Sequence, residues 1–146
     1  MTMLCRLVSS CLYLGELPAG GTWGSLVGWV LAWYFFEFSP FFLVVLCVMG
    51  YALSLIAEES FGSRDPSMFV LDEVCGMMLA VLWLPKTVWV YAAALVLFRL
   101  FDIWKPWPIS ILQKMKHPFS IMHDDLAAGL LANLILQGVL KIFFSR

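Results

Sequence analysis

The segment VLDEVCGMMLAVLWL, residues 70–84, places two adjacent carboxylates, Asp72 and Glu73, at the start of an almost purely apolar run. Such a run predicts a buried or membrane-embedded helix, and a charge beside hydrocarbon is costly. One acid could cap the helix, and a second could interact favourably with its dipole. Two neighbouring carboxylates repel each other, however, and one stays protonated unless a cation lies between them. The segment therefore predicts a helix in apolar surroundings with a cation site at its N-terminal end.

The composition of the whole chain indicates the same surroundings. Of its 146 residues, 62% are hydrophobic and 13% are charged, and the mean hydropathy is +0.91. A soluble globular chain has about a quarter of its residues charged. We therefore expect an integral membrane protein, and the net charge of −1 gives no reason to expect binding to nucleic acid.

The spacing of the apolar segments predicts an all-α membrane bundle in one domain, residues 1–146. A helix that crosses a bilayer needs about 20 apolar residues. We expect about four or five helices, two of them too short for ordinary spans and joined at Pro85 and Lys86. The apolar segments cover residues 23–36, 41–57, 74–84, 87–98 (the helix extending to 101) and 126–144.

If each break between these segments reverses the chain, most of the acidic residues gather at one membrane face. Arg99, Lys105 and the lysines near residue 115 lie on that face too. Lys and Arg in short loops mark the cytoplasmic side of a membrane protein. We therefore expect a multi-pass membrane protein with its polar site on the cytoplasmic face, although Lys86 and Lys141 on the opposite side argue against this orientation.

The acid pair of residues 72–73 has a counterpart in HDDLAAGLLANL, residues 123–134, where Asp124 and Asp125 precede an apolar run. Again one acid could be a cap, whereas two adjacent acids favour a cation. Carboxylate oxygens are the ligands that Mg²⁺ prefers, alongside water and phosphate. His123 borders this pair, and we expect it to be a surface residue.

Cationic residues that could bind phosphate lie in FRLFDIWKPWPI, residues 98–109. Arg99 and Asp102 are three residues apart and share a helix face, and Pro106 disfavours helix at Lys105. An arginine and a lysine beside a carboxylate can clamp a phosphate. The alternative is a structural ion pair at a helix end, with Trp104 and Trp107 as interfacial anchors.

A glycine-rich segment, GGTWGSLVG at residues 20–28, could add backbone donors. We expect a turn there, followed by a helix that Thr22 or Ser25 caps. Close packing of small residues between membrane helices is the alternative. Asp65, in DPSMFVLDEVCG, adds a further acid ahead of the first pair.

Four of these motifs, in this order, resemble those of bacterial phosphatidylglycerophosphatase A: GTWGSL, DPSMFVLDEVCG, FRLFDIWKPWPI and HDDLAAG. The resemblance implies a membrane-bound, all-helical, Mg²⁺-dependent phosphatase of the bacterial inner membrane. Such an enzyme removes the terminal phosphate of phosphatidylglycerophosphate to give phosphatidylglycerol. The polar motif positions of the family carry over onto Thr22, Ser25, Asp65, Asp72, Glu73, Arg99, Asp102, Lys105, Asp124 and Asp125.

From these residues we predict the parts of a phosphate monoester hydrolase. The two acid pairs, Asp72 with Glu73 and Asp124 with Asp125, would hold Mg²⁺, with Asp65 or Asp102 as a further ligand or base. Arg99 and Lys105 would hold the phosphoryl oxygens, and Thr22 and Ser25 would assist. The alternative is a small cation transporter or channel subunit with a carboxylate-lined site, which would spread its acids through the depth of the membrane.

Overall fold

Six helices make up the part of the chain that the structure describes. The computed structural model describes residues 9–11, 13, 15, 17–35, 37, 39–61, 69–107, 109–113 and 120–144. In chain order, the helices are α2 (Gly20–Tyr34), α3 (Ser39–Phe61), α4 (Leu71–Ala80), α5 (Val88–Trp104), α6 (Ile109–Gln113) and α7 (Ser120–Phe144). The described residues contain no β-strand, and the predicted all-α class is confirmed.

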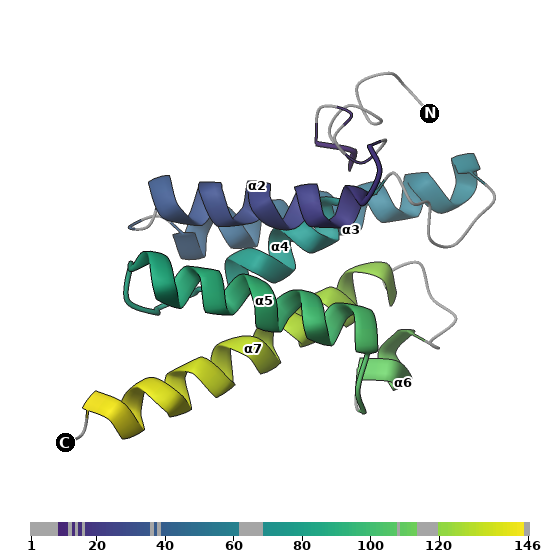
Figure 1. Ribbon diagram of the computed structural model, residues 1–146. Coiled ribbons are helices and arrows are strands. Elements are labelled where there is room, and N and C mark those ends of the chain that lie inside the picture. The colour runs from purple at the N-terminus through teal and green to yellow at the C-terminus, as the bar shows by residue number, and fades with distance from the viewer. Residues whose placement is uncertain are drawn as a thin grey trace.

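Helix α4 lies at the centre of the bundle, between α2 and α3 above and α5 and α7 below (Figure 1). Eight of its ten residues are buried. At about 1.5 Å per residue, ten residues extend only about 15 Å, half the thickness of a bilayer core. The burial of α4 means that other helices surround it, and its length means that it cannot cross a bilayer by itself.

The outer surfaces of the longer helices are apolar. Val44 and Val48 of α3 and Ile142 of α7 are among the large hydrophobic side chains that are exposed. Helix α7 is long and apolar enough over Met122–Phe143 to cross a membrane, and α3 has a shorter apolar stretch over Ser39–Leu55. Because outward-facing apolar side chains of this extent require an apolar environment, the fold is a membrane-associated helical bundle.

Helices α4 and α5 differ at their ends from the two short segments that the sequence predicted. Helix α4 begins at Leu71, earlier than the predicted residue 74, because acidic residues are favourable in the first turn of a helix. It ends at Ala80, ahead of the connection that contains Pro85. The predicted helix over 74–84 therefore extended too far toward the proline.

Helix α5 continues to Trp104, three residues beyond its predicted end. Lys105 then leaves the helix with a left-handed backbone (φ 43°, ψ 59°), although Pro106 favours an extended conformation for the residue before it. Helix α6 lies between the predicted segments that end at residue 101 and begin at residue 126, where no helix was predicted. Its five residues have no apolar periodicity long enough to be recognised.

The polar motifs meet because of how these helices run. The N-terminal ends of α4 and α7 and the C-terminal end of α5 lie at the same end of the bundle, to the right in Figure 1. The alternating path of the chain predicts this arrangement. The candidate site is built from these three helix ends.

Candidate metal and phosphate site

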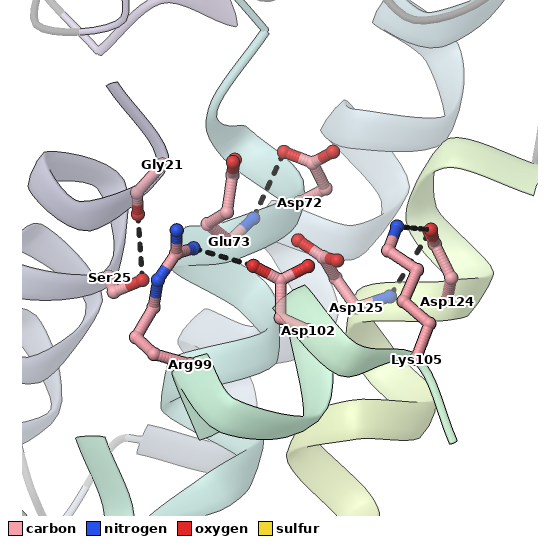
Figure 2. A network of polar contacts seen from close by, with 9 residues as sticks. All are labelled: Gly21, Ser25, Asp72, Glu73, Arg99, Asp102, Lys105, Asp124 and Asp125. Carbon is pink, nitrogen blue, oxygen red and sulfur yellow. Dashed lines mark hydrogen bonds and ion pairs between the residues drawn. The ribbon is translucent and has the colours of Figure 1, made fainter. Parts of the chain in front are cut away.

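Helix α4 positions the first acid pair. Asp72 is buried, and its Oδ1 accepts a hydrogen bond from the backbone N–H of Glu73 at 3.0 Å. The residue at the N-cap position is Val70, with no side-chain cap. Asp72 thus accepts one hydrogen bond from the first turn, and this leaves carboxylate oxygens of the pair available for other partners (Figure 2).

Helix α7 positions the second acid pair inside the helix. Because α7 begins at Ser120, Asp124 and Asp125 lie after its first turn and are not its cap. The prediction that the helix opens at these acids was wrong, since the apolar run that marks the helix in the sequence starts only after them. Both side chains are buried, and Asp124 Oδ1 accepts a hydrogen bond from the N–H of Asp125 at 3.2 Å.

Three acids from the two pairs form one cluster. One carboxylate oxygen from each of Asp72, Glu73 and Asp125 lies within 4.8 Å of the other two, a spacing that fits a single metal ion. Among the described residues, Glu73 Oε2 is buried without a hydrogen-bond partner. Three acids this close in an apolar interior need compensation by a cation or by protons.

The electrostatics of the protein without a metal agree with this need. Burial raises the pKa of Asp72 well above its usual range, and the nearby charge of Glu73 raises it further. A divalent cation with a preference for oxygen ligands would offset this unfavourable charge.

Arg99 and Asp102 form an ion pair on α5 beside the cluster. Arg99 Nη1 donates to Asp102 Oδ2 at 2.6 Å, which is the predicted i, i+3 pair. Figure 2 shows the Asp102 carboxylate between Arg99 and Asp125. The guanidinium is thereby fixed next to the acids, with about a fifth of its side-chain surface still exposed.

Lys105 joins the site from the end of α5. Its Nζ donates a hydrogen bond to Asp124 Oδ2, and the two residues form an ion pair. Burial lowers the pKa of Lys105, but the hydrogen bond and the charge of Asp124 outweigh burial, and the pKa is raised overall. Three of the four predicted metal ligands thus cluster, and the fourth, Asp124, pairs with this lysine.

The predicted turn at residues 20–25 is instead the beginning of α2. Ser25 is buried and donates its hydroxyl to the carbonyl of Gly21 at 2.7 Å, while Thr22 is exposed. A Cβ on Gly21 would lie 2.4 Å from Glu73 Oε1 and 3.0 Å from Arg99 Nη1. Glycine at this position leaves room for the ends of both side chains, and a Cβ on Gly24 would lie 2.9 Å from the carbonyl oxygen of Val70, which agrees with the close-packing interpretation of this motif.

Two further predictions concern Asp65 and His123. Asp65 lies outside the described residues. His123 is exposed, and its ring lies 5.5 Å from that of Tyr51. This histidine is a surface residue, as predicted.

A short segment near the N-terminus reaches the site without a recognisable motif. The carbonyl of Ser9 accepts a hydrogen bond from the N–H of Val70, just ahead of α4, at 3.0 Å. Ser10 is fully buried. Burial and the charge of Glu73 raise the pKa of Cys11 to about 11, so this thiol remains neutral beside the cluster. Nothing in the local sequence indicates this contact, because it depends on tertiary packing.

An all-helical membrane bundle with a buried acid cluster, an arginine and a lysine at one end fits the class of membrane-associated phosphatases. Comparison with known proteins identifies the family. The family model for phosphatidylglycerophosphatase A matches residues 7–140. The chain belongs to this family.

Individual relatives agree with this assignment. The chain is 37% identical to phosphatidylglycerophosphatase A of Escherichia coli K12, over 80% of this chain and 71% of the relative. It is 35% identical to the Haemophilus influenzae protein of the same name, over 84% and 79%. A Bacteroides thetaiotaomicron relative, 30% identical over 81% of each chain, is provisionally named a phosphatidylinositol-3-phosphatase. No solved structure matches the chain.

Proposed function

We propose that this protein hydrolyses the terminal phosphate monoester of phosphatidylglycerophosphate, giving phosphatidylglycerol and inorganic phosphate, and that it requires Mg²⁺. The observation that carries the proposal is the cluster of Asp72, Glu73 and Asp125, whose oxygens lie within 4.8 Å of one another beside Arg99. Membership of the family supplies the substrate.

The acid cluster fits a magnesium ion by its chemistry. Asp72, Glu73 and Asp125 would hold the ion, since it prefers carboxylate oxygens and tolerates few of them. Glu73 Oε2, which is buried and has no hydrogen-bond partner within the described part of the chain, supports this assignment. When bound, the ion would neutralise phosphate charge and increase the acidity of a nearby water molecule.

The cationic side chains would bind and orient the phosphate. Arg99 presents a planar fork that can contact two phosphoryl oxygens, and Asp102 holds this fork in place through the 2.6 Å ion pair. Lys105 adds a charged amine at the edge of the cluster. Contacts of this type contribute most when they strengthen as charge develops in the transition state.

The reaction breaks the bond between phosphorus and the lipid oxygen, while the oxygen of water forms a new bond to phosphorus. The proton released by the water needs an acceptor, and the leaving alcohol needs a proton. Asp102, which lies between Arg99 and Asp125, is a candidate for both transfers, and Asp65 is the alternative.

The transporter alternative is less well supported. A cation path would require charged residues through the depth of the bundle, yet α7 carries none between Asp125 and Lys141. We place the enzyme in the inner membrane as a multi-pass protein with its site at the cytoplasmic face. The acyl chains of the substrate would remain among the helices while its head group reaches the acids.

A direct test is phosphate release by the purified protein in mixed micelles. We expect turnover of phosphatidylglycerophosphate and much slower turnover of phosphatidylinositol 3-phosphate. Asp125→Asn is the matched control for contaminating phosphatases. Equal rates in the wild type and in this variant would reject the assignment of the site, and a preference for the inositol lipid would reject the assignment of the substrate.

A further inference from the structure

The C-terminal end of α4 is held by one side chain from α7. Asn133 is buried, and its Nδ2 donates hydrogen bonds to the carbonyls of Ala80 at 3.1 Å and of Leu82 at 2.8 Å. The last carbonyls of a helix lack partners within the helix, and leaving them unpaired in an apolar interior is costly. Asn133 supplies partners in a place that water reaches poorly, since Ala80 is fully buried.

The amide of Asn133 is held in one orientation. Gln137 Nε2 donates a hydrogen bond to Asn133 Oδ1 at 2.7 Å, so the amide oxygen is used as well as the amide nitrogen. A primary amide offers two donor hydrogens, and the two carbonyls take both of them. Asn133 therefore cannot rotate or shift without losing several hydrogen bonds at once.

The same two helices form the metal cluster at their other end. Three positions on each helix, spaced four residues apart, pair in order: Asp72, Gly76 and Ala80 on α4 with Asp125, Gly129 and Asn133 on α7. At the middle pair, a Cβ on Gly129 would lie 2.1 Å from the carbonyl oxygen of Gly76. The helices thus run side by side in contact and in matched steps.

We infer that Asn133 is a positioning residue for the acid cluster. By fixing α4 along α7 at one end, it sets the spacing of Asp72 and Glu73 from Asp125 at the other. Eight residues of helix, about 12 Å, separate Asn133 from Asp125, so Asn133 does not contact the substrate. The inference rests on the proposed metal-dependent function.

The test measures metal binding directly. Mn²⁺ serves as the probe, because binding removes the signal of the free ion in electron paramagnetic resonance. The variant is Asn133→Asp, which has the same shape but lacks the amide hydrogens. Leu134→Ala is the control, since Leu134 is the exposed neighbour on the same helix. Phosphate release and thermal melts are measured on the same samples.

We expect Asn133→Asp to weaken Mn²⁺ binding by about tenfold or more, as loss of an outer residue that orients metal ligands commonly does. At metal concentrations that saturate each protein, kcat should fall while KM for the lipid stays unchanged. Leu134→Ala should match the wild type in every measurement. Wild-type Mn²⁺ binding in Asn133→Asp, with only its melting temperature lowered, would overturn the positioning role and leave the proposed function intact.

Two further results decide the remaining cases. If the wild type itself binds no Mn²⁺, the metal-dependent function fails, and the positioning role fails with it. If Asn133→Asp does not fold, Gln137→Leu replaces it, because this change removes only the bond that orients the amide. Gln137→Leu should weaken Mn²⁺ binding by about threefold, the value of one modest hydrogen bond. Wild-type binding in that variant would also overturn the inference.

Discussion

The two acid pairs of this chain have the same pattern in the sequence but different surroundings in the fold. On α4, Asp72 and Glu73 both contribute to the cluster. On α7, Asp125 joins the cluster while its neighbour, Asp124, pairs with Lys105. Successive residues on a helix point about 100° apart, and Asp124 and Asp125 accordingly have different partners.

The difference between the pairs predicts which acids are indispensable. Asp125→Asn should lower the rate of phosphate release by about a thousandfold or more, because it removes a proposed metal ligand worth several kcal/mol in the transition state. Asp124→Asn is the matched change on the next residue, and we expect a loss of only about tenfold from its effect on Lys105. The measurement is steady-state turnover of the lipid by both purified variants. Equal losses would mean that the two aspartates are equivalent.

Asp72 should behave like Asp125 and should not act as a helix cap. Asn can accept the backbone N–H of Glu73 as Asp72 does, so Asp72→Asn preserves that hydrogen bond. It should nevertheless abolish turnover. Mg²⁺ should raise the melting temperature of the wild type, since a ligand that binds the folded state stabilises it. The same Mg²⁺ titration should leave the melting temperature of Asp72→Asn unchanged. If Mg²⁺ stabilises this variant as much as the wild type, and the variant is fully active, Asp72 is better explained as a helix cap.

Arg99 tests whether the cationic residues, like the acidic ones, take part in the reaction or only stabilise the fold. If Arg99 clamps the phosphate, Arg99→Lys should lower the rate by about 10²-fold, mostly in kcat, because lysine lacks the planar fork. If Arg99 only pairs with Asp102, the substitution should retain most of the activity.

The double variant Arg99→Met with Asp102→Leu sharpens this test. Removing both partners avoids a buried unpaired charge, so we expect the protein to fold. The phosphate-clamp model predicts a folded but inactive enzyme. A folded double variant with high activity would make the ion pair purely structural, and thermal melts in detergent serve as the folding control.

The smallest effects should come from α2. Ser25→Ala removes one hydrogen bond to Gly21 and should cost about 1 kcal/mol of stability. Thr22→Val, on the exposed side, should leave stability unchanged. Because Thr22 was predicted to contact the phosphate, its kinetic effect is informative: a rise in KM for the lipid would support that contact, and wild-type kinetics would exclude it. Denaturation and kinetics of both variants provide the comparison.

Much of the fold was visible in the sequence because apolar runs and polar breaks report helix positions directly. The helical class, the presence of a short helix after residue 70 and the clustering of charged helix ends all follow from that pattern. The exact starts of α4 and α7 do not follow from it. Helix α4 starts early because acidic residues are favourable in its first turn, and α7 starts ahead of the apolar run that marks it in the sequence. The start of α7 at Ser120 is the clearest example.

The site was predictable as a set of residues and less so as a geometry. Composition alone could not separate Asp124 from Asp125, because the separation depends on where α5 places Lys105. The packing of Gly21 against Glu73, and the bonds from Asn133 to α4, join residues about 50 positions apart. No local pattern in the sequence encodes such contacts.

The central claim is that the acid cluster binds a metal ion that catalysis requires. The most direct test strips the purified protein of metal with EDTA and follows phosphate release from phosphatidylglycerophosphate before and after adding back cations. We predict no turnover in the stripped protein, full recovery with Mg²⁺, and poor recovery with Ca²⁺, which accepts a looser geometry than the octahedron of Mg²⁺. Full turnover by rigorously metal-free protein would contradict the claim.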